Sequence, residues 1–171
     1  MPEGPALHPA CEPFAVLLGT WSGRGAGEYP TIEDFEYFED VSFTHVGKPF
    51  LAYTQRTRHA HTGLPLHSEA GYLRPTGEDR AELVVAQPSG ILEVDTGSFD
   101  GRRLELRSIE VVRSPTAKEV TEVRRDIEVD GEVLRYEVHM AAVGQPCILH
   151  LRAELHRDRD EAGRGTSTAD R

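Results

Sequence analysis

The stretch Gly19-Thr20-Trp21-Ser22-Gly23-Arg24-Gly25 holds the only tryptophan of the 171-residue chain and alternates glycine with larger residues. Glycine in a strand marks a bulge, a sharp bend or a place where another group approaches the backbone closely. A large aromatic side chain between such glycines suits a small barrel, in which the tryptophan fills one end. On spacing alone, an ordinary glycine-rich strand and loop fits this stretch as well.

Turn signals recur along the rest of the chain at nearly regular intervals, and the runs between them are rich in Val, Leu, Tyr and Phe. Asp-Gly and similar dipeptides accept positive φ angles and favour tight hairpins. The turn signals lie at residues 47–49, 62–63, 76–79, 88–90, 100–101, 130–131 and 144–146. This pattern predicts an all-β antiparallel meander of about ten strands, closed as a barrel or folded as a sandwich. The one helix we expect is short, over residues 11–18.

Two segments show which side chains face the interior. Residues 133–142 alternate apolar with polar positions, as a half-buried strand does. The apolar set, which we assign inward, is Leu134, Tyr136, Val138, Met140 and Ala142. His139 then faces outward. In residues 35–43 the inward set is Phe35, Tyr37, Val41 and Phe43, interrupted by Glu39. A barrel of about ten strands is wider than its side chains can fill, so it can hold a ligand.

Charge and composition narrow the range of partners and compartments. The net charge of −10 argues against nucleic acid and anionic membranes, which both select basic surfaces. No secretory signal begins the chain, and Cys11 and Cys147 are expected to be free thiols, so we predict a cytoplasmic protein. We expect it to be a monomer or a homodimer. We expect an N-terminal leader over residues 1–12, one barrel domain over 13–157 and a charged, disordered tail over 158–171.

The glycine and tryptophan motif, with Gly19, Trp21, Gly23 and Gly25 in their places, resembles the GxWxGxG signature of the nitrobindins, heme-binding β-barrel proteins. Further segments are similar in the same order: Tyr29-Pro30-Thr31, Phe35-Glu36-Tyr37, His45-Val46-Gly47-Lys48-Pro49, Pro65-Leu66-His67-Ser68-Glu69, Gln145-Pro146 and His150-Leu151. The resemblance covers roughly residues 13–157. It implies a lipocalin-like, up-and-down barrel that holds ferric heme b, binds nitric oxide and isomerises peroxynitrite to nitrate. Because the chain has no CxxCH sequence, the heme would be held without a covalent bond.

The resemblance also implies that His150 is the axial ligand of the heme iron. Strand alternation points the other way, because the odd positions of residues 147–155 are the apolar set and His150 lies opposite them. Two arrangements would reconcile these observations. Either a β-bulge shifts the register here, or the odd face packs under the N-terminal segment while Ile148 and His150 face the cavity.

Five more residues are candidates for contact with heme, each with a simpler structural role as the alternative. Thr31 matches a heme-contacting threonine of the family and could equally cap a turn. Leu66 and His67 match a segment that lines the distal side, where His67 could donate a hydrogen bond to a bound ligand. Met140 projects inward and suits either a core or a heme face. Lys118 could pair with a propionate or be solvated.

Two other classes of function stay open from the sequence. Gly-x-Trp near the start of the first strand also resembles lipocalins and fatty-acid-binding proteins, which carry apolar small molecules. An arginine or tyrosine inside the cavity, able to bind a carboxylate, would favour that carrier. A barrel that serves only as an interaction module is the third possibility. Nucleophile-elbow and phosphate-loop patterns do not occur in the sequence, so no other enzyme class has comparable support.

Overall fold

The computed structural model describes residues 4–159. Within that range the chain forms one 3₁₀ helix followed by ten strands. In chain order these are η1 (Pro9–Leu17), β1 (Gly19–Gly27), β2 (Phe35–Thr44), β3 (Leu51–His59), β4 (Pro65–Pro75), β5 (Arg80–Ala86), β6 (Ile91–Phe99), β7 (Arg103–Arg113), β8 (Val120–Asp130), β9 (Val133–Ala142) and β10 (Ile148–Arg157).

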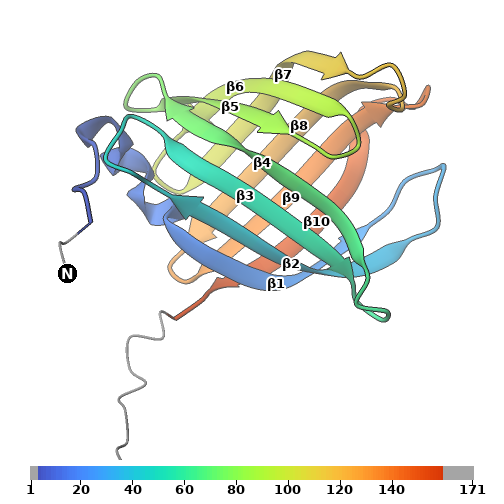
Figure 1. Cartoon of the computed structure of the whole chain (residues 1–171), viewed down its shortest axis with the longest axis horizontal. Coiled ribbons are helices and arrows are strands. Elements are labelled where there is room, and N and C mark those ends of the chain that lie inside the picture. The colour runs from blue at the N-terminus through green and yellow to red at the C-terminus, as the bar shows by residue number, and fades with distance from the viewer. Residues whose placement is uncertain (1–3, 160–171) are drawn as a thin grey trace, which may run out of the picture.

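The strands form a closed, up-and-down barrel (Figure 1). Each strand pairs antiparallel with its neighbours in sequence, and β1 pairs with β10 to close the sheet. The prediction of about ten strands in an all-β barrel is confirmed, and the sandwich alternative is wrong because no break separates two sheets among the described strands. No helix in the described part of the chain is long and apolar enough to cross a membrane.

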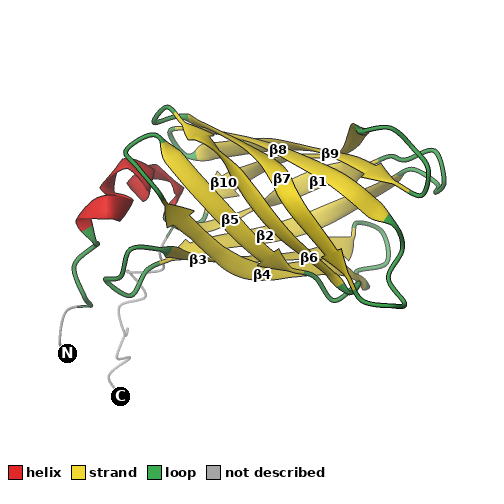
Figure 2. Cartoon of the chain, turned by 90° about the horizontal axis from the view of Figure 1, so that it is seen from above, coloured by secondary structure: helices red, strands yellow, loops and turns green. Residues whose placement is uncertain are grey.

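The helix η1 covers one end of the barrel (Figure 2). Its buried residues Cys11, Phe14 and Leu17 pack against Trp21, whose side chain is 0% exposed. Trp21 Nε1 donates a hydrogen bond to the carbonyl oxygen of Leu17 at 2.9 Å, and the guanidinium of Arg157 lies 4.0 Å from the centre of the indole ring. Trp21 therefore plugs this end, as the motif predicts.

Three glycines of β1 have one of the roles expected of glycine in a strand, the close approach of another group to the backbone. Gly23, Gly25 and Gly27 follow Trp21 on the inward face of β1. A Cβ atom on Gly25 would overlap the ring of Tyr37, and one on Gly27 would overlap the ring of Phe35. At Gly23 a Cβ atom would meet the backbone of β10. The glycines therefore allow close approach of aromatic rings and of the closing strand.

The segments at the two ends of the chain differ in detail from the expected ones. The helix begins at Pro9 instead of residue 11, and it is a 3₁₀ helix; Pro13 within it has no N–H to donate. The first residue of the expected tail, Asp158, is hydrogen-bonded to β1 through Ser22 Oγ at 2.9 Å and the Thr20 carbonyl oxygen at 2.8 Å. Residues 160–171 of that tail lie outside the described residues. Cys11 and Cys147 are free thiols.

Replacing Trp21 by alanine should lower the free energy of unfolding by about 3–5 kcal/mol, the usual cost of deleting a large buried aromatic side chain. Chemical denaturation of the two proteins under the same conditions measures the difference. Tyr72→Ala is the matched control, because Tyr72 is 51% exposed on the outer face. A loss of less than about 1 kcal/mol in Trp21→Ala would contradict the role of Trp21 as a plug.

Candidate functional site

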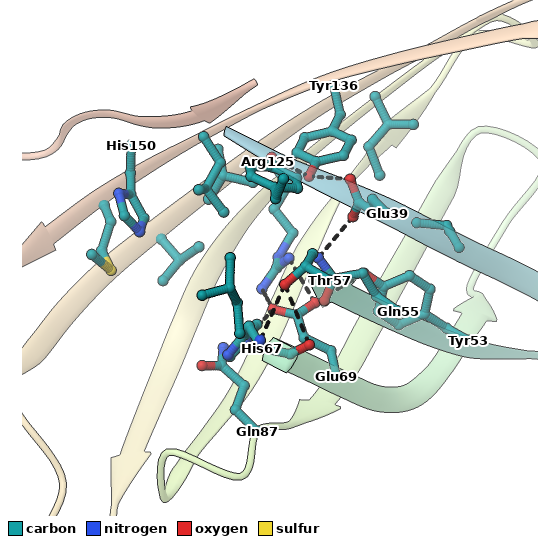
Figure 3. A pocket seen from close by; sticks show the side chains of 18 of the residues that line it. Glu39, Tyr53, Gln55, Thr57, His67, Glu69, Gln87, Arg125, Tyr136 and His150 are labelled. Atoms are coloured by element: carbon teal, nitrogen blue, oxygen red, sulfur yellow. Dashed lines mark hydrogen bonds and ion pairs between the residues drawn. The ribbon is translucent and has the colours of Figure 1, made fainter. Parts of the chain in front are cut away.

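A cavity of about 330 Å³ occupies the barrel interior at the end away from η1. Its side chains fall into two groups along the barrel axis, and Figure 3 labels Glu39, Gln55, Glu69, Arg125 and Tyr136 of the deeper one. The group towards the rim is mainly apolar and includes Ile32, Phe35, Leu66, Val138, Met140 and Leu151. The deeper group includes apolar side chains such as Phe43 and Leu134, and it also holds the polar side chains of the cavity, Glu39, Gln55, Glu69, Glu93, Arg125 and Tyr136. The cavity therefore offers an apolar mouth above a polar floor.

His150 reaches the cavity because β10 contains a bulge. Leu149 pairs with the outward-facing His139, whereas Leu151 pairs with the inward-facing Val138, so the register shifts between Leu149 and Leu151. The shift turns Leu151 inward as well, and both His150 and Leu151 line the cavity. The simple alternation that placed His150 on the outer face fails at this point, because one extra residue reverses the parity of the strand.

Backbone and ring contacts fix the orientation of the His150 imidazole. Its Nδ1 lies 3.0 Å from the carbonyl oxygen of Glu28, and that oxygen can only accept, so Nδ1 carries the proton. The Glu28 N–H in turn donates to the His150 carbonyl oxygen at 2.9 Å. The ring of Tyr29 packs edge-on against the imidazole with centroids 5.2 Å apart. In the neutral ring this tautomer leaves the lone pair on Nε2, the atom available to a metal.

The protonation state of His150 also suits the binding of a metal ion. Burial lowers the pKa of His150, the Glu28 carbonyl opposes that shift, and the nearby His67 adds to it. A lowered pKa favours the neutral imidazole at neutral pH. Neutral imidazole is the form that ligates metals.

His67 lies on β4 and lines the same cavity as His150. Its backbone N–H donates to Thr57 Oγ1 at 3.1 Å, which ties this part of β4 to β3. Its Nε2 lies 3.6 Å from Glu69 Oε1. Leu66, at the rim, is half exposed and also lines the cavity. The structure thus brings together His150, His67, Leu66 and Met140 of the residues that the sequence singled out.

The other two expected contacts lie apart from these four. Thr31 is exposed in the loop between β1 and β2, beside the cavity-lining Ile32. Lys118 is exposed in the loop between β7 and β8. Neither Thr31 nor Lys118 is among the described residues that line the cavity.

The polar floor is organised around Arg125, which is 7% exposed. Its guanidinium contacts three carboxylates, those of Glu69 at 3.0 Å, Glu93 at 2.7 Å and Asp95 at 3.3 Å. Burial alone would raise the pKa of Glu69, but Arg125 and His67 together outweigh it and hold that pKa at about 2. Burial raises the pKa of Asp95 to about 7 despite its contact with the same arginine. One cation is thus shared among several acids.

Glu39 is a fourth buried acid of the barrel interior, and it has no cationic partner among the described residues. It is 1% exposed and accepts hydrogen bonds from Gln55 Nε2 at 2.7 Å and from the Tyr136 hydroxyl at 2.6 Å. The Tyr136 oxygen lies 2.8 Å from the Tyr37 hydroxyl. Burial raises the pKa of Glu39 to about 7, although the two hydrogen bonds act in the opposite direction.

Sequence reasoning missed most of this floor. Glu39 was read as an interruption of the inward set of β2, whereas it continues that set between Tyr37 and Val41. Arg125 likewise occupies an inward position of β8, between Val123 and Ile127. The available signal was a charged residue at an inward position of an otherwise apolar alternation. The partners of each such residue come from distant strands, so the sequence gives no indication of them.

The mouth of the cavity fits heme by its chemistry. Apolar walls suit the faces of a macrocycle, and a half-buried, neutral imidazole with its Nε2 lone pair available suits its iron. The residues that would hold the group are His150 on β10 with Met140 on the neighbouring β9, and His67 with Leu66 on β4 across the cavity.

Comparison with known proteins also points to heme. Residues 10–157 match the model of the family described as "THAP4-like, heme-binding beta-barrel domain". The chain is 54% identical over 157 residues to peroxynitrite isomerase 2 of Mycobacterium avium (strain 104), which covers 90% of this chain and 98% of that protein. It is 52% identical over 160 residues to peroxynitrite isomerase 1 of Mycobacterium tuberculosis (strain ATCC 25618 / H37Rv), with the same coverage of 90% and 98%.

A solved structure is similar as well. The crystal structure of Rv2717c from M. tuberculosis superposes with a TM-score of 0.85 at 51% sequence identity. The match covers 90% of this chain and 100% of that one. The likeness therefore extends over the whole barrel.

The raised pKa of Glu39 makes the stability of the heme-free protein depend on pH. Glu39 has a pKa of about 7 in the folded protein, against an ordinary value of 4.5. Protonation of Glu39 therefore stabilises the fold fully below about pH 4.5, and this stabilisation is lost as the pH rises through 7. Relative to wild type, Glu39→Gln should therefore gain about 3 kcal/mol of unfolding free energy between about pH 4 and about pH 8. Urea denaturation of both proteins across that range measures the gain. A difference between variant and wild type that stays constant with pH would contradict the assignment.

Proposed function

Because the chain belongs to the THAP4-like, heme-binding β-barrel family, we propose that it binds heme in the mouth of its barrel and isomerises peroxynitrite to nitrate. The family membership and the barrel fold confirm the nitrobindin resemblance of the sequence. The observation that carries the proposal is the bulge in β10, which turns His150 into an apolar cavity with Nε2 free.

In this proposal His150 holds the iron through Nε2. The Glu28 carbonyl keeps the proton on Nδ1 and prevents rotation of the ring. A hydrogen bond of this kind to the other ring nitrogen is the usual companion of a metal-bound histidine. The Tyr29 hydroxyl donates to the Met140 carbonyl oxygen at 3.1 Å and accepts from the Ala142 N–H at 2.9 Å, so the ring beside His150 is itself fixed to β9.

Across the cavity from His150, the side chains of His67 and Leu66 on β4 would line the space left for a small ligand. When bound, heme supplies an iron centre at which the peroxynitrite anion can bind and rearrange. Leu66 would shield that space from water, and His67 could donate a hydrogen bond to the ligand. The reaction has no net proton transfer, so these residues orient and shield the reactant, and none of them has to act as acid or base.

Several finer parts of the proposal rest on the sequence. They are the ferric state, the b-type heme held without a covalent bond, the binding of nitric oxide, the cytoplasmic location and a monomeric or dimeric state. Thr31 and Lys118 belong to the proposal as contacts of the propionates. Thr31 lies in the exposed loop between β1 and β2, and Lys118 lies in the exposed loop between β7 and β8. In such exposed loops, charged groups of the heme could meet solvent.

The carrier of fatty acids is less well supported, although the cavity does contain an arginine and tyrosines. A carrier of carboxylates needs a cation or hydroxyl that is free to bind one. Arg125 already contacts three carboxylates, and the hydroxyls of Tyr53 and Tyr136 donate to Glu69 and Glu39. The carboxylate of a fatty acid would therefore find the hydrogen-bond donors of the floor already bound to the protein's own carboxylates.

His150→Ala should fold and lose heme affinity by about 100-fold or more, because it removes the only protein donor proposed for the iron. Peroxynitrite isomerisation should fall with it. His67→Ala should keep the heme and change the kinetics of ligand binding. Titration of each heme-free variant with heme, followed at the Soret band, measures the affinities.

His139→Ala is the matched control, because His139 faces outward beside the bulge and pairs with Leu149. It should bind heme as wild type does. Unchanged affinity in His150→Ala, or loss of heme in His139→Ala, would show that the proposed ligand is wrong.

A further inference from the structure

The barrel interior holds more acidic than basic side chains. Four buried carboxyl groups, those of Glu39, Glu69, Glu93 and Asp95, stand against one buried guanidinium, that of Arg125. Together they form the acidic cluster. Among the described residues that line the cavity, Arg125 is the only arginine or lysine. An excess of buried negative charge opposes folding unless a positive group or a bound proton balances it.

Glu39 differs from the other acids of the cluster. Glu69, Glu93 and Asp95 all contact Arg125, whereas the oxygens of Glu39 accept hydrogen bonds only from Gln55 and Tyr136. Glu39 also lines the same cavity as His150, and both side chains appear around it in Figure 3. A charge on Glu39 therefore acts on whatever occupies the cavity without a neighbouring cation to cancel it.

We propose that ionised Glu39 stabilises the ferric state of the bound heme and takes up a proton when the iron is reduced, an inference that rests on the proposed function. Ferric heme carries one more positive charge than ferrous heme, and a buried anion favours the more positive state. One electron passes from an external one-electron reductant to the iron, and one proton passes from solvent to a carboxylate oxygen of Glu39. Reoxidation by a one-electron acceptor returns the electron, and Glu39 releases the proton.

The surroundings of Glu39 accommodate both protonation states. The ionised carboxylate accepts two hydrogen bonds, from Gln55 and Tyr136. The protonated acid can donate to Gln55 Oε1 once that amide turns over, and this buried oxygen has no hydrogen-bond partner in the described residues. A pKa of about 7 places the change of state within the physiological range.

The neighbours that face Glu39 come from β2, β3, β4, β8 and β9. They are Tyr37, Tyr53, Glu69 with its partner Arg125, and Tyr136, while Asp40 follows Glu39 on the outer face. Burial raises the pKa of each of the three tyrosines, and Arg125 keeps Glu69 ionised. Glu39 is thus the member of this set that changes charge near neutral pH. Asp95 titrates in the same range, but it pairs with Arg125 and does not line the cavity.

The test is the midpoint reduction potential of the heme-loaded protein, measured by spectroelectrochemistry from about pH 5 to about pH 9. In wild type the potential should fall as the pH rises through neutrality. Glu39→Gln should match wild type at the acidic end and lie above it at the alkaline end, because the variant has no charge to gain. A profile for Glu39→Gln that coincides with that of wild type would overturn the proposal.

Two further variants separate the effect of the Glu39 charge on the reduction potential from the effect of any nearby negative charge. Asp40→Asn removes the same charge one residue away on the exposed outer face, and its profile should follow wild type. Tyr136→Phe keeps the carboxylate but removes a hydrogen bond to its ionised form, so the fall in potential should move to higher pH. This variant decides the question if Glu39→Gln does not fold. An Asp40→Asn shift equal to that of Glu39→Gln, or an unmoved Tyr136→Phe profile, would overturn the inference.

The same series distinguishes the inference from the proposed function. A wild-type protein that shows no Soret band after heme titration would refute both. A protein that binds heme and isomerises peroxynitrite, with potentials that do not respond to Glu39, would refute only the inference.

Discussion

Closure of the sheet between β1 and β10 is the constraint on which the other features depend. The pairing runs from Trp21 opposite Arg157 to Gly27 opposite Leu151, so one pair of strands spans both ends of the barrel. At one end it places Arg157 over the Trp21 ring; at the other, the Glu28 carbonyl meets His150. Inward glycines on β1 make the closure possible, because side chains there would overlap β10 or the rings of β2.

The closed barrel then sorts its interior by polarity along the axis. Around Trp21 the core is apolar and tightly covered by η1, so this end contributes stability. At the other end the apolar rim leaves room for a flat ligand. Between the two lies the acidic cluster, which an optimally stable barrel would replace with apolar residues. Buried acids with one shared cation lower stability at neutral pH, and such arrangements gather where function requires a charge.

The bulge in β10 shows how a local irregularity can decide a function. Alternation correctly assigned the inward set of β9, of which Leu134, Tyr136, Val138 and Met140 line the cavity. The same rule put His150 on the outer face of β10, because it assumes an uninterrupted period of two. One extra residue changes the parity of the strand between Leu149, which pairs with the outward-facing His139, and Leu151, which pairs with the inward-facing Val138. The resemblance of the motifs pointed to His150 in spite of the alternation, since it compares whole segments and not single strand faces.

The sequence by itself determined the barrel, its approximate number of strands, the Trp21 plug and the family, because each of these follows from periodicity, turn residues and an ordered series of motifs. The tertiary structure alone decided that Glu28 orients His150, that Glu39 continues an inward face and that three acids share Arg125. These contacts join residues far apart in the chain, and their formation depends on the strand register around the closed sheet. A one-residue shift in that register would turn each of them to the opposite face, so only the folded barrel settles them.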